Sequence, residues 1–194
     1  MVYILLLATE KDFISLKLKV KKRKVESEKF EIMIPINSLA TLAKNAETNN
    51  KAFFKNIKPK QSHKTDELFH KINDEVFSKI NCLECANCCK TLGPRFSERD
   101  ISRISKKMNI KPSAFASKYL IIDEDDDYIF KTIPCPFLDS ENYCAIYEYR
   151  PKACSDYPHT QQPEILKKQK ITIKNSFTCP AVFEVLEKVK QIWE

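Results

Sequence analysis

The stretch NCLECANCCKTLGPRF, residues 81–96, contains four of the eight cysteines of the chain: Cys82, Cys85, Cys88 and Cys89. The other four lie further along: Cys135, Cys144, Cys154 and Cys179. Such a pattern is typical of a disulfide framework, a zinc site, an iron–sulfur ligand set or a redox thiol pair. Because the first 81 residues contain no cysteine, we expect the eight thiols to converge on a common centre.

A disulfide framework meets two objections. The apolar N-terminus has no basic residue ahead of it, so we interpret it as a buried strand rather than a signal peptide and expect a cytoplasmic protein with reduced thiols. The α-carbons of Cys88 and Cys89 are about 3.8 Å apart along the chain, below the usual ~4.4 Å of a bridged pair. A chain of 194 residues can also bury a core without crosslinks.

A metal centre agrees better with the local spacing. In Cys-x-x-Cys the turn brings two thiolates within reach of one ion, and the metal favours the thiolate form. Cys82, Cys85 and Cys88 form two overlapping steps of this spacing, as in a ferredoxin ligand run, but the fourth ferredoxin cysteine is absent at residue 92. Cys-Pro pairs occur only later, at 135–136 and 179–180. A zinc ribbon would need a second Cys-x-x-Cys knuckle. Eight thiols exceed the needs of one tetrahedral ion, which favours a cluster or two sites.

Composition excludes several classes of protein. The hydrophobic fraction of 43% and charged fraction of 30% are those of a globular domain, and no apolar run approaches the ~20 residues of a membrane span. The net charge of +7 lies entirely within residues 1–60, so the cysteine-bearing part gives no reason to expect nucleic-acid binding. Gly93 is the only glycine, which argues against a P-loop or Rossmann nucleotide site.

Hydrophobic periodicity predicts an α+β fold that is mainly helical with short hairpins, organised as a small cysteine-rich domain around a metal. We expect a helix from about residue 37, a break at 58–62 and an amphipathic helix over 65–80 capped by Thr65. Ser97 and Asp100 form a predicted capping box for a helix that ends at Asn109, and a short helix runs from Ser113 to about Leu120.

Two further elements follow from the pattern. The acidic run 123–127 lacks the alternation and glycine of a calcium loop and is expected to be a hairpin turn. Pro180 starts a last helix that we expect to pack on the helix at 65–80. Residues 1–36 are predicted to be an N-terminal extension with a strand pair around the basic turn KKRK, or an upstream mis-start, and residues 37–194 the cysteine-cluster domain.

The motifs CLECANCC, CPFL, YCAIYEYRPKACSDYPHT and CPAVFE resemble the YkgJ-type CxxCxxCC cysteine-cluster family of zinc- or iron-chelating domains, over roughly residues 37–194. The resemblance implies metal chelation by all eight cysteines in a small cytoplasmic bacterial protein, through an iron–sulfur cluster or zinc. Flagellin lysine N-methylases carry a similar cysteine set, so a link to methyl transfer is conceivable. This chain shows no S-adenosylmethionine loop, and residues 1–32 depart from the family pattern.

We therefore expect a metal-binding protein, with an iron–sulfur cluster as the leading cofactor, a structural zinc module as the alternative, and a thiol redox or methyltransfer-linked enzyme as a minor alternative. Nothing in the sequence identifies a substrate or a protein partner. Arg150 either offsets thiolate charge or holds a carboxylate, or it pairs with Glu148 or Asp156. His159 is expected outside the ligand set, and four tyrosines are expected to cover the site: Tyr143, Tyr147, Tyr149 and Tyr157.

Overall fold

A computed structural model describes residues 34–193 of the chain. Its longer helices are α2 (Ile36–Asn56), α3 (Ser62–Ser78), α6 (Glu98–Lys107), α7 (Pro112–Tyr119), α9 (Gln169–Asn175) and α10 (Pro180–Ile192). Its short helices are η1 (Pro59–Gln61), α4 (Cys82–Cys85), α5 (Asn87–Thr91), η2 (Tyr147–Tyr149) and α8 (Lys152–Asp156). Strands β1 (Leu120–Ile122) and β2 (Tyr128–Phe130) pair antiparallel. The predicted class, α+β and mainly helical, is confirmed. None of the described helices is long and apolar enough to cross a membrane.

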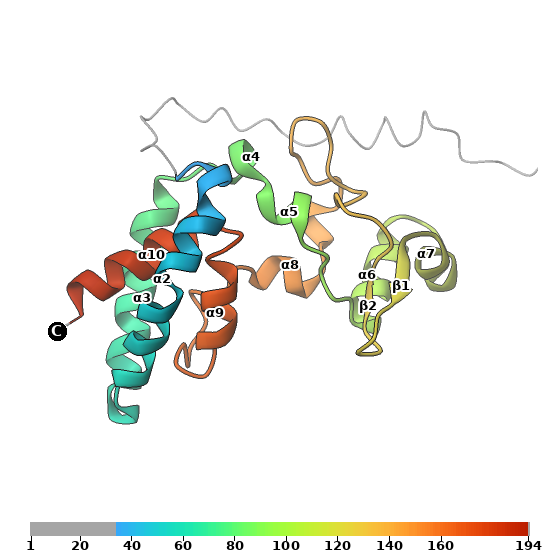
Figure 1. The fold of residues 1–194 in the computed structure, drawn as a ribbon. Helices are drawn as coiled ribbons and strands as arrows, with labels where there is room; N and C mark the ends of the chain where they lie inside the picture. The colour runs from blue at the N-terminus through green and yellow to red at the C-terminus, as the bar shows by residue number, and fades with distance from the viewer. Residues whose placement is uncertain (1–33, 194) are drawn as a thin grey trace, which may run out of the picture.

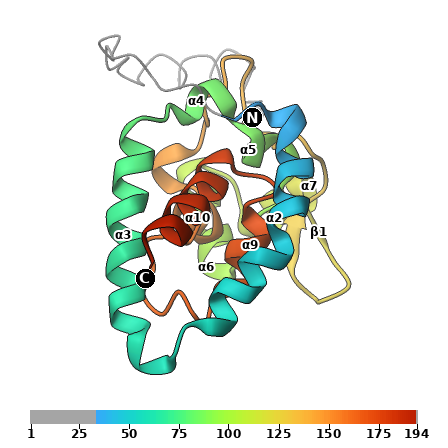
Figure 2. The ribbon, with the colours of Figure 1, turned by 60° about the vertical axis from the view of Figure 1, so that its left-hand side comes forward.

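Helices α2, α3, α9 and α10 form what we call the helical lobe (Figure 1). α10 packs against α3, as predicted, and also against α2 and α9, so that it lies in the middle of the group (Figure 2). Its apolar stripe, which includes Val182, Leu186 and Val189, is fully buried against Phe69 and Ile72 of α3. Burying side chains of this size stabilises a fold by about 1.5–3 kcal/mol each.

Helices α6 and α7 and the β1–β2 pair form a second group, the hairpin lobe, with its own apolar core (Figure 1). Phe115 of α7 lies at its centre, stacked on Phe137 with the ring planes 4° apart. The predicted capping box of Ser97 and Asp100 starts α6, and Asn109 follows its end in the left-handed conformation, φ 55°. The acidic run forms the turn between β1 and β2, as predicted.

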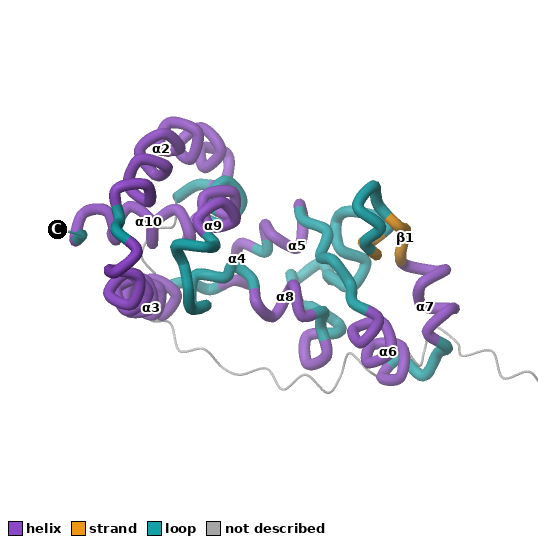
Figure 3. Tube along the Cα trace, turned by 90° about the horizontal axis from the view of Figure 1, so that it is seen from below, coloured by secondary structure: helices purple, strands orange, loops and turns teal. Residues whose placement is uncertain are grey.

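The segment that carries the first four cysteines connects the two lobes. Seen from below, α4, α5 and α8 lie between the helical lobe and the hairpin lobe (Figure 3). The two apolar cores are separate clusters, so the cysteines occupy the junction between two independently packed groups.

One predicted boundary is wrong. Thr65 does not cap the helix, because α3 begins at Ser62, directly after the turn at η1. Thr65 lies fully buried inside α3, where its hydroxyl donates to the Gln61 carbonyl at 2.8 Å. A threonine can satisfy its hydroxyl in this way within a helix, so the residue type alone did not fix the start. The predicted N-terminal strand pair lies outside the described residues.

Candidate metal centre

The CxxCxxCC run is broken in its middle by Ala86. This residue takes the left-handed conformation, φ 46° and ψ 19°, and separates α4 from α5. Its amide donates to the Cys82 carbonyl at 2.8 Å, and its carbonyl accepts from the Lys90 amide at 3.0 Å. Asn81 caps α4 by accepting from the Leu83 amide at 3.1 Å. The four cysteines therefore lie on two short helices rather than on one continuous helix.

The helical lobe brings a distant cysteine to this run. The side-chain amide of Asn87 donates to the Thr178 carbonyl at 2.7 Å, which holds the start of α10 against α5. Cys179 is the N-cap residue of α10 and packs on the core of the helical lobe. Burial raises the pKa of its thiol to about 12, the amides of Val182 and Ala181 oppose this rise, and the charges of Cys82 and Cys85 add to it. We call the four neighbouring thiols tetrad A: Cys82, Cys85, Cys88 and Cys179.

The hairpin lobe gathers a second set. The Cys135 amide donates to the Cys89 carbonyl at 3.0 Å, and Cys144 forms a β-bridge with Leu138, three residues after Cys135. Burial, together with the charges of the other three thiols, raises the pKa of Cys154 to about 12. We call this set tetrad B: Cys89, Cys135, Cys144 and Cys154.

The two tetrads meet at one peptide bond. The sulfurs of Cys88 and Cys89 are 4.0 Å apart, about twice the length of a disulfide bond, and all eight cysteines are free thiols. This contact lowers the pKa of Cys89 to about 7 and raises the pKa of Cys88. The charge of Cys89 also raises the pKa of Cys82, although less than burial does, so Cys89 adjoins both sets.

Seven of the eight thiols are half-buried, and Cys82 is exposed. Burial and mutual repulsion raise the pKa of five of them: Cys82, Cys135, Cys144, Cys154 and Cys179. The pKa of Cys88 is raised first by its contact with Cys89 and then by burial. Within residues 34–193, no group of three or more His, Cys, Asp or Glu side chains is already arranged so that it could hold one ion. A bound metal would stabilise the thiolate form of these cysteines, and rotation of the side chains would have to complete the coordination.

The hydroxyl group of Tyr157 lies beside tetrad A and is available to bond to a ligand there. Its hydroxyl is buried and has no hydrogen-bond partner within the described part of the chain. Burial raises the pKa of this phenol, and so do the charges of all four tetrad A thiols. A buried hydroxyl without a partner is costly, and a sulfur-rich ligand at tetrad A would supply an acceptor. The donor set and this orphaned hydroxyl therefore fit a thiolate-bound metal or cluster.

Comparison with protein families finds a match to the model described as "CxxCxxCC: Putative zinc- or iron-chelating domain", over residues 81–180, which is just over half of the chain. The chain belongs to the CxxCxxCC family. Membership confirms the predicted family and assigns the protein to zinc or iron chelation. The match begins at Asn81 and ends at Pro180, so α2 and α3 precede the matched region. Comparison with curated proteins and with solved structures gave no match.

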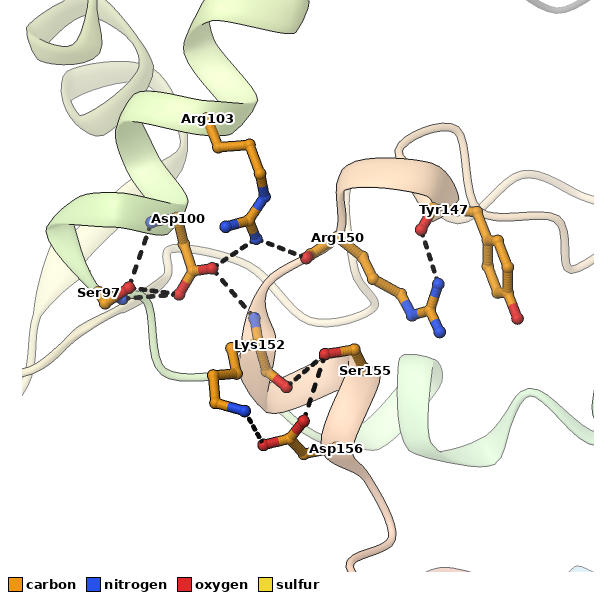
Figure 4. A network of polar contacts seen from close by, with 8 residues as sticks. All are labelled: Ser97, Asp100, Arg103, Tyr147, Arg150, Lys152, Ser155 and Asp156. Atoms are coloured by element: carbon orange, nitrogen blue, oxygen red, sulfur yellow. Dashed lines mark hydrogen bonds and ion pairs between the residues drawn. The ribbon is translucent and has the colours of Figure 1, made fainter.

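A polar network within the CxxCxxCC domain positions α8, and sequence reasoning missed it (Figure 4). Asp100, which the sequence predicts only as a capping residue, also accepts from the Lys152 amide at 3.1 Å and from Arg103 at 2.6 Å. Arg103 in turn donates to the Arg150 carbonyl at 2.8 Å. Cys154 lies two residues after Lys152 in α8, so the capping box of α6 helps to set the position of a tetrad B thiol. The burial of Asp100, which is only 2% exposed, is the structural sign that its carboxylate does more than cap α6.

Arg150 and its neighbours differ in part from the expectations. Asp156 pairs with Lys152 at 2.7 Å, whereas the Arg150 guanidinium stacks on Tyr147 with its centre 3.9 Å from that ring. Its charge lowers the pKa of Cys144 and Cys154, against the larger effect of burial, which favours the charge-offsetting interpretation. Tyr147 is 58% exposed, so it does not cover the thiols as predicted.

Proposed function

We propose that the protein binds an iron–sulfur cluster through tetrad A. The observation that carries the proposal is the Asn87–Thr178 hydrogen bond of 2.7 Å, which brings Cys179-Pro180 beside the CxxCxxC run. In two-cluster ferredoxins one cluster is held by three cysteines of such a run and by a remote cysteine that precedes proline. From spacing alone only the first three of these ligands matched, and the fold adds a candidate for the fourth.

The surroundings of tetrad A support thiolate ligands. Cys179 caps α10, so the free amides and the positive end of the helix dipole lie beside its sulfur. Helix N-termini favour thiolates for this reason. The unpartnered Tyr157 hydroxyl can donate to a ligand sulfur, and hydrogen bonds to sulfur are one of the means by which proteins set cluster potentials. A bound cluster would supply one-electron transfer at a site whose Cys82 edge reaches solvent.

The test is anaerobic purification of the full chain, followed by an ultraviolet–visible spectrum and by iron, acid-labile sulfide and zinc determinations. We expect a brown protein with thiolate-to-iron charge transfer, and loss of colour, iron and sulfide in Cys179→Ser. Thr178→Ser is the matched control, because the tether uses the backbone carbonyl of this residue, and it should keep the cluster. A colourless protein that contains zinc in tetrad A would overturn the proposal in favour of a structural zinc module.

A further inference from the structure

Tetrad B is a set of four thiols that the proposed cluster does not use. Its members come from three separate segments of the chain. Cys89 ends the CxxCxxCC run in α5, Cys135 and Cys144 lie on the loop that follows β2, and Cys154 lies in α8. Long-range contacts must therefore bring these three segments together.

Backbone hydrogen bonds place the first three. The Cys135 amide donates to the Cys89 carbonyl at 3.0 Å, so α5 and the loop after β2 are in direct contact. The Leu138–Cys144 bridge and the Ala145 amide, which donates to the Phe137 carbonyl at 2.8 Å, close residues 135–145 into a tight hairpin. Cys135 and Cys144 therefore stand at the two ends of this hairpin, on the side that adjoins Cys89.

Cys154 is brought to the same place by α8. The Lys152 amide is anchored on Asp100, and the Cys154 amide donates to the Pro151 carbonyl at 2.9 Å. The thiols whose charges act on Cys154 are Cys89, Cys135 and Cys144, the other members of tetrad B. This agrees with the backbone contacts in separating tetrad B from Cys179, which packs on the core of the other lobe.

Two basic side chains adjoin tetrad B. The charge of Arg150 lowers the pKa of Cys144 and Cys154, and that of Lys90 lowers the pKa of Cys89, although the Lys90 ammonium donates its hydrogen bond to the Cys85 carbonyl of tetrad A at 3.1 Å. A divalent ion with four thiolates carries a net charge of −2, and Arg150 would offset part of it. Residues 135–149 contain only a β-bridge and the short helix η2, so a metal crosslink would add to the few backbone bonds that hold this segment.

We propose that tetrad B is a second metal centre, separate from tetrad A, in which four thiolates hold one zinc ion that joins α5, the 135–145 hairpin and α8. Because these side chains are not yet arranged around one ion, their χ1 angles would have to rotate when zinc binds. Four thiolates in a closed tetrahedral set are typical of structural zinc. This second centre depends on the proposed function in one respect, because that function assigns Cys88 to tetrad A and so leaves Cys89 for tetrad B. The zinc ion fixes the hairpin lobe to the segment that bears the CxxCxxC run.

The experiment measures zinc, iron and acid-labile sulfide per chain in anaerobically purified wild type and in two reciprocal pairs of variants. Cys144→Ser and Cys154→Ser should lose about one zinc per chain and keep iron and sulfide. Cys82→Ser and Cys179→Ser should lose iron and sulfide and keep zinc. Each pair is the control of the other, because the substitution is the same.

A measurement on the wild type covers the case in which a variant does not fold. A zinc chelator should remove zinc while the visible absorption of the cluster persists, and amide exchange should rise in residues 135–156 but not in α10. Loss of iron and zinc together in all four variants would show one shared centre and overturn the inference. So would a wild type without zinc whose tetrad B thiols are alkylated in the native state. If the wild type holds zinc in both tetrads and no iron, the proposed function fails but the second centre stands.

Discussion

The Asp100 carboxylate accepts a hydrogen bond from the Lys152 backbone amide at 3.1 Å, across a separation of 52 residues. The same carboxylate accepts from the Ser97 hydroxyl at 2.6 Å and from Arg103 at 2.6 Å. One buried side chain thus starts α6 and anchors the start of α8. A substitution at Asp100 should therefore alter the position of Cys154.

We expect Asp100→Ala to lower the free energy of unfolding by roughly 1–3 kcal/mol, because the amide of Lys152 and the Ser97 hydroxyl lose a buried acceptor. It should also increase the rate at which a chelator removes zinc. Urea unfolding and chelator competition measure the two effects. The control is Asp156→Ala, which removes an ion pair with the largely exposed Lys152 side chain and should cost no more than about 1 kcal/mol. Equal losses in the two variants would contradict the anchoring role.

The same carboxylate should make stability depend on acid pH. Burial raises the pKa of Asp100, but the hydrogen bonds from Ser97, Arg103 and Lys152 outweigh it and hold the pKa below the ordinary value of an aspartate. A depressed folded pKa means that the contribution is complete above the unfolded pKa and is lost as pH falls through the folded pKa. Below about pH 4, wild type should lose stability more steeply than Asp100→Asn in parallel urea titrations. Identical slopes would show that Asp100 is not stabilised as an anion.

The tether between α5 and α10 should control cluster retention. Asn87→Ala removes the donor to the Thr178 carbonyl, so Cys179 is held less closely to the CxxCxxC run. We expect iron to be lost to a chelator roughly 10–100-fold faster, as is typical when an outer contact of a metal site is removed. Thr91→Ala is the matched control on the same helix, because its hydroxyl bonds only to the Asn87 carbonyl within α5. Unchanged iron release in Asn87→Ala would argue against Cys179 as a ligand.

Tyr157→Phe should alter the electronic properties of the cluster without altering its amount. The variant removes the unpartnered hydroxyl beside tetrad A and keeps the ring. Because a hydrogen bond to sulfur stabilises the reduced cluster, we expect a more negative midpoint potential at equal iron content. Tyr149→Phe is the control, since Tyr149 lies beside Cys144 of tetrad B. A shift in the control but not in Tyr157→Phe would reverse the assignment of the two tetrads.

Much of the fold follows from local signals. The capping box at Ser97, Pro180 at the start of α10 and the acidic turn depend on residues close in sequence, and each was predicted. The predicted start of α3 was wrong, because the helix begins directly after the turn at η1 and not at Thr65. The division of the cysteines was beyond sequence reasoning, because the partner of Cys88 or Cys89 depends on contacts with residues far along the chain. The long-range bonds of Asp100 were hidden for the same reason.

The left-handed residue Ala86 decides the shape of the chelating loop. In a continuous helix Cys82, Cys85 and Cys88 would form a stripe about 9 Å long, and its ends would be too far apart to share one small ligand. The left-handed conformation of Ala86 interrupts that stripe between Cys85 and Cys88, at a conformational cost of about 1–2 kcal/mol for a residue with a β-carbon. Glycine would remove this cost, yet the methyl group of Ala86 is buried, with 6% of the residue exposed. The packed side chain of Ala86 thus fixes the break between α4 and α5, where a glycine would leave the backbone free to move.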